Sequence, residues 1–326
     1  MSKVAYFGIT LRSYEEAEHI IKNELNITID SDTIRKVVNY VGQSVYLYES
    51  KKAYECMEQF HNGSLNFTNN KNGILFLEID GAHLNTRLKN KKESSWRENK
   101  LCIAFNSNDC TEYTNSDGEK CLKIGKREYI SIFGSVDEFK KHCFYLALKR
   151  GHGEFKETVL INDGANWIRA LKDELFPSAQ QILDFFHLAQ NTNKFAHAIF
   201  KDDKTKAHDY YLYWRDLLKN GEYEEVLRDI FIYKDYKFND GTVNLYNYIT
   251  NNINNIDYPT YKKRGYFIGS GAIESANKYV IQSRLKGPGM KWNPVTAQYV
   301  ISLRAKYCSN SWPEVDEILI NRLQNN

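Results

Sequence analysis

The chain has 326 residues, of which 42% are hydrophobic and 26% are charged, and its formal net charge is +3. That balance is ordinary for a globular protein, and no apolar run reaches the roughly 18 residues of a membrane-spanning helix. Residues 1–10 lack the basic and apolar regions of a secretory signal. The six cysteines are scattered without a CxxC pair, which argues against a zinc ribbon and a disulfide framework. A cytoplasmic protein without membrane contacts is expected.

The N-terminal segment has helical patterns. Ser13 and Glu16 have the spacing of a capping box ahead of an amphipathic helix, and a turn at residues 26–30 leads to a second helix. A helix-turn-helix DNA reader would show this pattern, and so would a small helical cap. The apolar face of the second helix carries Ile34, Val37, Val38, Val41 and Val45. Its polar face carries the candidate DNA contacts Arg35, Lys36 and Asn39.

Beyond residue 73 short apolar runs predict strands that alternate with helices. Three antiparallel-type strands, followed by helix, strand, helix and strand, are the order of an RNase H-like α/β layer with a mixed sheet. The first strand is expected to end at Asp80-Gly81. The predicted elements are strands at 74–79, 100–105 and 128–133, a helix at 135–150, a strand at 158–161, a helix at 165–175 and a strand at 181–186.

Residues 188–261 are helical in pattern and rich in tyrosine, which predicts an all-α insertion. A helix from about residue 272 to Gly287-Pro288-Gly289 and a last helix at 294–307 follow it. The predicted organisation is an N-terminal helix-turn-helix-like segment at 1–70, an RNase H-like domain at 71–187 and 268–326, and an insertion domain at 188–267.

Three carboxylates have positions that suit a divalent metal site. Asp80 and Asp163 each follow a short apolar strand and precede a glycine, which permits a turn and a close approach to the backbone. Glu274 is on the helix after the insertion. Mg²⁺ prefers oxygen ligands, and two-metal phosphoryl transfer needs carboxylates from several elements. Each Asp-Gly pair alone is typical of an ordinary turn, but the three acids together predict one metal site.

Basic residues are concentrated near the C-terminus. Between Tyr261 and Lys306 there are nine basic residues and one acid, Glu274, so this window carries a net charge of +8. Such a stretch predicts a polyanion partner, although a solvated basic helix face has the same composition. The candidate phosphate contacts are Lys278, Arg284, Lys286 and Lys291.

Several blocks of the sequence resemble bacterial insertion-sequence transposases of the DDE class. The resemblance is greatest to the Kra-type group, which is related to mutator-like transposases, and it covers roughly two thirds of the chain. The blocks are IDGAHLNTR (79–87), SSWRENKLCIAF (94–105), REYISIFGSVDEFKKH (127–142), INDGANWIRALKDELFP (161–177), QQILDFFHLAQN (180–191) and IGSGAIESANKYVIQSRLKGPGMKW (268–292).

The resemblance implies a function and roles for individual residues. Asp80, Asp163 and Glu274 match the DDE triad, with Mg²⁺ or Mn²⁺ as the cofactor. Asp184 and His187 match a [C/D]xxH motif of transposases with a helical insertion before the final glutamate. The implied partners are transposon terminal repeats and target DNA, bound by a homodimer or larger assembly in the nucleoid. Two alternatives stay open, namely a shortened non-catalytic copy that represses transposition and an RNase H-like nuclease without strand transfer.

Overall fold

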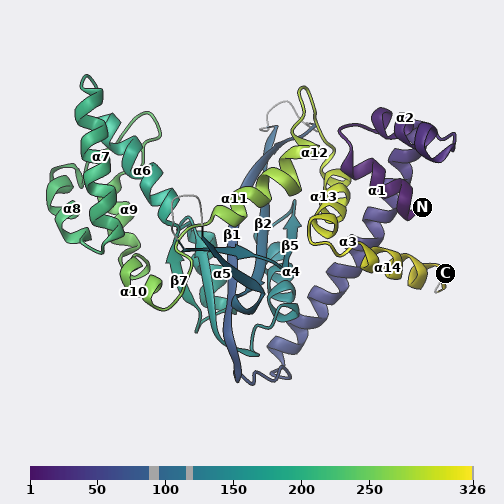
Figure 1. Cartoon of the computed structure of the whole chain (residues 1–326), viewed down its shortest axis with the longest axis horizontal. Helices are drawn as coiled ribbons and strands as arrows, with labels where there is room; N and C mark the ends of the chain where they lie inside the picture. The colour runs from purple at the N-terminus through teal and green to yellow at the C-terminus, as the bar shows by residue number, and fades with distance from the viewer. Residues whose placement is uncertain (88–94, 115–119, 325–326) are drawn as a thin grey trace. The chain divides into compact units, whose positions relative to one another are not determined.

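A computed structural model describes residues 1–87, 95–114 and 120–324 of the chain (Figure 1). The chain divides into two compact units, Met1–Thr158 with Ala272–Asn326, and Val159–Gly271. No described helix is both long enough and apolar enough to cross a membrane.

A five-stranded mixed sheet has the strand order β5-β2-β1-β6-β7, so the predicted mixed sheet flanked by helices is confirmed. β1, β2 and β5 pair antiparallel, whereas β6 and β7 pair parallel. Many of their apolar side chains, among them Leu75, Phe76 and Ile103, are fully buried. The strands are β1 (Lys71–Asn85), β2 (Trp96–Asn106), β5 (Arg127–Ile132), β6 (Phe155–Asn162) and β7 (Gln180–Leu183).

β1 does not end at Asp80-Gly81, so that prediction is wrong. Asp80 pairs with Leu101, and the ladder with β2 continues to the end of β1. Gly81 makes room for the side chain of Glu98, because a Cβ atom at this position would lie 2.5 Å from Oε1 of Glu98. The glycine therefore permits a carboxylate to approach the strand, and it does not make a turn.

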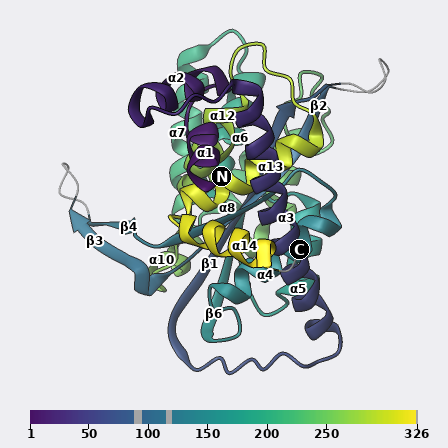
Figure 2. The ribbon, with the colours of Figure 1, turned by 90° about the vertical axis from the view of Figure 1, so that its right-hand side faces the viewer.

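β7 is shorter than expected, because its last predicted residues start a helix. The strand ends at Leu183, and Asp184 caps helix α6 (Phe185–Ile199) by accepting a hydrogen bond from the Phe186 N–H at 3.0 Å. The prediction of a strand over residues 181–186 was therefore wrong at its C-terminal end. Elements that were not predicted include α1 (Ser2–Thr10), α14 (Trp312–Gln324) and the two paired strands β3 (Cys110–Thr114) and β4 (Lys120–Ile124), which extend from their unit in Figure 2.

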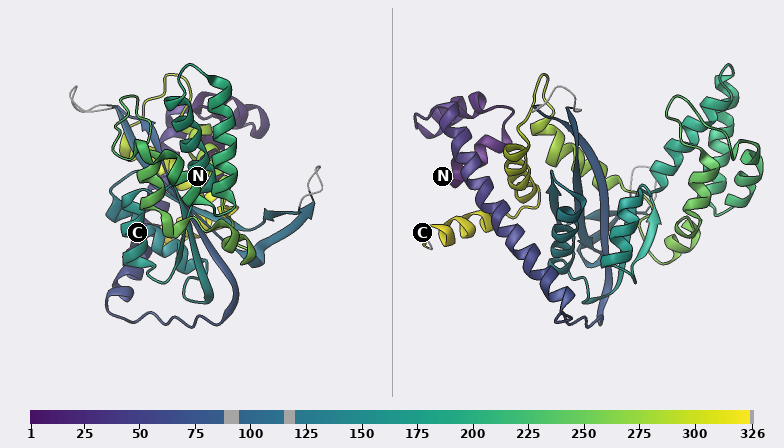
Figure 3. Two further views of the ribbon diagram at one scale, coloured as in Figure 1. Left: turned by 90° about the vertical axis from the view of Figure 1, so that its left-hand side faces the viewer. Right: turned by 180° about the vertical axis from the view of Figure 1, so that it is seen from behind.

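The N-terminal helices belong to the first unit and pack on its other helices. Ser13 caps α2 (Tyr14–Leu25) by accepting the Glu16 N–H at 3.1 Å, as the capping box predicts. α3 (Ser31–His61) packs along α13 (Pro294–Cys308) and α4 (Val136–Lys149), as Figure 3 shows. Four of the five predicted apolar-face residues of α3 are fully buried: Ile34, Val38, Val41 and Val45.

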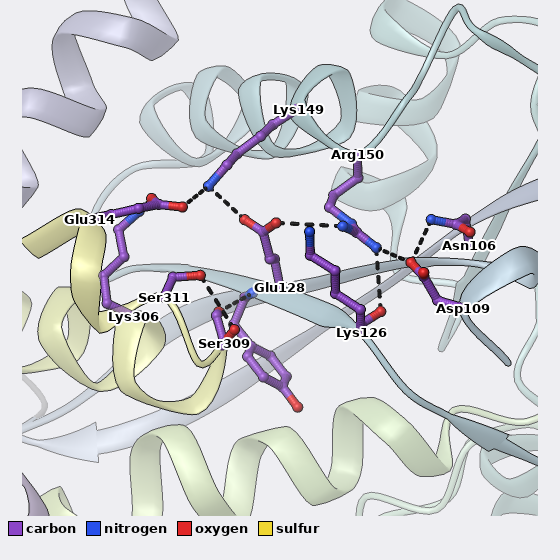
Figure 4. Close-up of polar contacts among 11 residues, drawn as sticks. Asn106, Asp109, Lys126, Glu128, Lys149, Arg150, Lys306, Ser309, Ser311 and Glu314 are labelled. Carbon is purple, nitrogen blue, oxygen red and sulfur yellow. Dashed lines mark hydrogen bonds and ion pairs between the residues drawn. The ribbon is translucent and has the colours of Figure 1, made fainter.

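A chain of alternating charges connects α3, α4, α13, α14 and the β5 region; Figure 4 shows all its members except Glu49. Lys306 is 5% exposed and contacts Glu49 at 2.9 Å and Glu314 at 2.7 Å. Burial alone would lower the pKa of Lys306, but the two carboxylates raise it above its usual value. The members, in order, are Glu49, Lys306, Glu314, Lys149, Glu128, Arg150 and Asp109.

The second unit contains the helical segment that was predicted as an insertion (Figure 1, green). α6 packs on α7, and α7 and α9 both contact α8. Phe195 and Trp214 are buried and form part of the helical core. The helices of this unit are α5 (Asn166–Leu175), α6, α7 (Lys204–Lys219), α8 (Tyr223–Ile230), α9 (Leu245–Asn251) and α10 (Tyr258–Lys263).

Candidate functional site

Asp184 is a completely buried carboxylate in the second unit, and four donors bind its two oxygens. Oδ1 accepts the N–H groups of Phe186 and Ser270, each at 3.0 Å. Oδ2 accepts the Ser270 hydroxyl and Nδ1 of His187, the latter at 2.5 Å. Burial disfavours the ionised form, but the hydrogen bonds from His187 and Ser270 outweigh it and lower the pKa of Asp184. Asp184 is therefore an anion inside the protein.

The contact with Asp184 fixes the orientation of His187. An imidazole that donates its Nδ1–H to a carboxylate presents Nε2 as the acceptor, and Nε2 can then bind a metal ion or a proton. The His187 side chain is 28% exposed, so solvent and ligands reach the ring. Because its oxygens already accept four hydrogen bonds, Asp184 is better suited to position His187 than to bind a substrate.

Asp163 follows β6 just as Asp184 follows β7. The two strands are parallel neighbours, with Asn162 paired to Leu183, so both acids lie at the same edge of the sheet. Oδ1 of Asp163 accepts the Ala165 N–H at 2.9 Å. The predicted turn at Gly164 is confirmed, because this glycine has φ +85°, in the left-handed region. The turn leaves Asp163 half-buried at the end of the strand.

In the first unit, two hydrogen bonds connect the helix that carries Glu274, and its continuation, to β1. This helix is α11 (Gly271–Ala276), and a π-helix (Asn277–Gln282) and α12 (Ser283–Leu285) continue it. The Ile273 N–H donates to Oε2 of Glu78 at 2.8 Å, and Nδ2 of Asn277 donates to Oδ2 of Asp80 at 2.6 Å. Glu274 lies between these two attachment points and is exposed, so it belongs to the same region as Asp80.

Three residues of these networks were not predicted from the sequence: Glu78, Ser270 and Asn277. Glu78 had a detectable signal, since it precedes Asp80 by two residues and alternate residues of a strand point to the same face. It is 1% exposed. Ser270 and Asn277 carried no comparable signal, because their partners are 86 and 197 residues away in the sequence.

The predicted cationic face is smaller than the sequence suggested. Arg284, Arg304 and Lys306 are 3%, 5% and 5% exposed, so they do not contribute to an open basic surface. The Nε atom of Arg284 donates to the carbonyl of Gly8 at 3.1 Å, and a contact of this buried arginine with phosphate stays a prediction. The other candidates, Lys278, Lys286 and Lys291, are exposed on the first unit.

The three candidate DNA contacts of α3 are in different environments. Arg35 and Lys36 are exposed and both contact Asp32 of the same helix, at 2.5 and 2.8 Å. Asn39 is half-buried, and its Oδ1 is enclosed without a hydrogen-bond partner among the described residues. Recognition of DNA by these residues stays a prediction.

Residues 3–308 match the uncharacterised protein family UPF0236, and the chain belongs to this family. No curated protein matches it. A solved structure of a Drosophila P element transposase strand transfer complex shares 10% sequence identity, with 90% of this chain and 83% of that chain covered and a TM-score of 0.21. At that TM-score the similarity carries no information on function.

Proposed function

We propose that this chain is a DNA transposase of the DDE class with an RNase H-like catalytic layer. The observation that carries the proposal is the attachment of the Glu274 helix to the carboxylate-bearing strand β1 through Glu78 and Asp80. The strand order β5-β2-β1-β6-β7, three antiparallel strands and a parallel pair, agrees with such a layer. The resemblance of the sequence blocks to Kra-type transposases gives the reaction class.

The donor groups fit a divalent metal ion. Asp80, Asp163 and Glu274 supply carboxylate oxygens, which Mg²⁺ and Mn²⁺ accept. Because Ser270 binds Asp184 and precedes Glu274 by only four residues, chain connectivity keeps this glutamate near the aspartate.

Each group has a role in the proposed reaction. The triad holds the ions, which when bound supply positive charge for water activation and for the leaving 3′ oxygen. Asp184 orients His187, and Nε2 of His187 takes a proton or contacts the bound strand. Lys278, Lys286 and Lys291 bind phosphates and position the DNA without reading its sequence.

Substitution of the triad tests this proposal. Asp80→Asn, Asp163→Asn and Glu274→Gln should each slow Mg²⁺-dependent cleavage of a labelled duplex by at least about a hundredfold, because each removes metal-binding charge. The substrate is a duplex carrying the genomic repeats that flank the coding sequence. Circular dichroism melting should show that the variants stay folded.

Asp173→Asn is the matched control, because this aspartate is 66% exposed and pairs with Lys172 away from the candidate site. It should cleave at the parental rate. Cleavage within tenfold of the parent by any triad variant would remove that residue from the site. A parent that binds the repeats and never cuts them would instead be a repressor.

A further inference from the structure

The first unit contains a second site, which we call the Trp292 pocket. It is a cavity of about 590 Å³ between the start of α2, the N-terminal part of α3, the end of β1 and the loop that follows α12. Its lining includes Tyr14, Arg35, Asn39, Arg87, Lys291 and Trp292. A pocket of this size accommodates a small organic ligand and exceeds the needs of a single inorganic anion.

The pocket is strongly cationic. Arg35, Arg87, Arg284 and Lys291 line it, against one lining acid, Glu15, and against Asp32, which pairs with Arg35. Arg284 is 3% exposed and, among the residues that the structure describes, has no carboxylate within ion-pair distance. A buried cation without an anionic partner costs free energy, which a negatively charged ligand would offset. These charges favour a negatively charged occupant.

Aromatic rings and an amide give the pocket the features of a base-binding site. The Arg284 guanidinium lies 4.6 Å from the Tyr14 ring centroid and 5.4 Å from that of Trp292. Asn39 contributes a buried oxygen without a partner in the described part of the chain. Nucleic-acid bases stack on aromatic rings and donate N–H groups to an acceptor such as Oδ1 of Asn39, whereas an ionised phosphate gains nothing from either.

Trp292 is held in place before any ligand binds. Its backbone N–H donates to the Asn85 carbonyl at 3.1 Å, and its carbonyl accepts the Arg87 N–H at 2.9 Å. Its indole Nε1–H donates to the Leu285 carbonyl at 3.0 Å. A ring fixed in this way loses little conformational entropy on binding, which favours affinity.

We propose that the Trp292 pocket binds one unpaired nucleotide of DNA. The base stacks against Trp292, Asn39 forms a hydrogen bond with the base edge, and Arg35, Arg87 and Lys291 hold the flanking phosphates. The identification of DNA as the source of the nucleotide rests on the proposed function. The pocket itself is formed by residues other than the carboxylates that hold the metal ions.

A fluorescence titration of the full chain in EDTA tests this proposal, because cleavage is then blocked. One duplex carries a single unpaired 2-aminopurine nucleotide at its 3′ end, and a second carries an abasic residue there. The parent should quench 2-aminopurine and bind the first duplex about tenfold more tightly, as expected for stacking of one base. Trp292→Leu should abolish the quenching and the preference.

Further variants keep the test decisive if Trp292→Leu fails to fold. Asn39→Ala should reduce the preference for the unpaired base, and Lys291→Ala should weaken binding of both duplexes alike. The matched controls are Tyr54→Leu, an aromatic residue of α3 that is 56% exposed, and Lys51→Ala, whose side chain is 76% exposed. Both controls should behave as the parent does.

Equal affinity of the parent for the two duplexes would overturn the proposal. Displacement of the duplex by inorganic phosphate as readily as by a nucleoside monophosphate would overturn it in favour of an anion site. Displacement by an acidic peptide at the same concentration would indicate a protein partner instead. A chain that prefers the unpaired base but does not cleave DNA would contradict the proposed catalysis and support the nucleotide pocket. A chain that cleaves DNA without a base preference would support the catalysis and contradict the pocket.

Discussion

Asp184 and Arg284 are both charged groups in the protein interior, and they differ in how their charge is stabilised. Four hydrogen-bond donors surround the Asp184 carboxylate and keep it ionised. Arg284 has a backbone carbonyl and two aromatic rings, and burial lowers its pKa. Buried charges need such partners because desolvation costs several kcal/mol. A carboxylate with four hydrogen-bond donors serves to position a neighbour, whereas a buried arginine with no described carboxylate in ion-pair contact is suited to an anionic ligand.

The protonation of His152 should make the stability of the protein depend on pH. Burial lowers its pKa to about 4, and Nδ1 lies 3.1 Å from the Thr158 hydroxyl. Between the usual value near 6.5 and pH 4, the unfolded chain binds a proton that the folded chain does not. The free energy of unfolding therefore falls as the pH falls through this window, by about 1.4 kcal/mol per pH unit from this residue.

His152→Gln removes this titration. Urea denaturation between pH 6.5 and 4 should show a smaller loss of stability in the variant than in the parent, by about 1.4 kcal/mol per pH unit. The same pH dependence in both proteins would contradict a half-buried histidine that stays neutral in the folded chain.

Among the contacts between helices, the packing of α3 on α13 depends on the absence of a side chain at Gly42. A Cβ atom at this position would lie 2.5 Å from the carbonyl oxygen of Tyr299. Replacing a helical glycine with alanine normally stabilises a helix by about 1 kcal/mol. Here the clash is with helix backbone that cannot move aside, and overpacking of this kind costs about 1–3 kcal/mol or more.

Gly42→Ala should therefore lower the free energy of unfolding, with a reduced urea midpoint as the measurement. Gly271→Ala is the control, because a Cβ atom there would meet nothing within 4 Å. It should leave the midpoint unchanged or raise it. If Gly42→Ala were as stable as the control, α3 and α13 would not pack as closely as described.

The sequence predicted the secondary-structure elements better than it predicted the contacts and burial of individual side chains. Hydrophobic periodicity located the strands of the sheet and most of the helices, and glycine after Asp163 correctly predicted a turn, because φ there is +85°. The corresponding Asp80-Gly81 pair gave a wrong prediction for the end of β1, because a glycine can make room for a nearby side chain as well as permit a turn. Composition also could not distinguish exposed Lys286 from buried Arg284, since both belong to one basic run.

In the whole molecule, the proposed function requires carboxylates on β1, after β6 and on α11 together with exposed lysines of the first unit. The basic residues that stay exposed there, Lys278, Lys286 and Lys291, follow Glu274 within one stretch of the chain. Carboxylates that hold metal ions repel DNA phosphates unless cations are near, so this sequence of charges suits a nuclease-type site.

Strand transfer by the full chain is the reaction that distinguishes a transposase from a nuclease or a repressor. A pre-cut duplex ending in the flanking repeat, with a free 3′-OH, is incubated with supercoiled target DNA and Mg²⁺. If the chain is a DDE transposase, the parent and Asp173→Asn should give covalently joined products, and Asp163→Asn and Glu274→Gln should give none. Cleavage without joining would make the chain a nuclease, and joining that survives loss of Glu274 would contradict the proposed site.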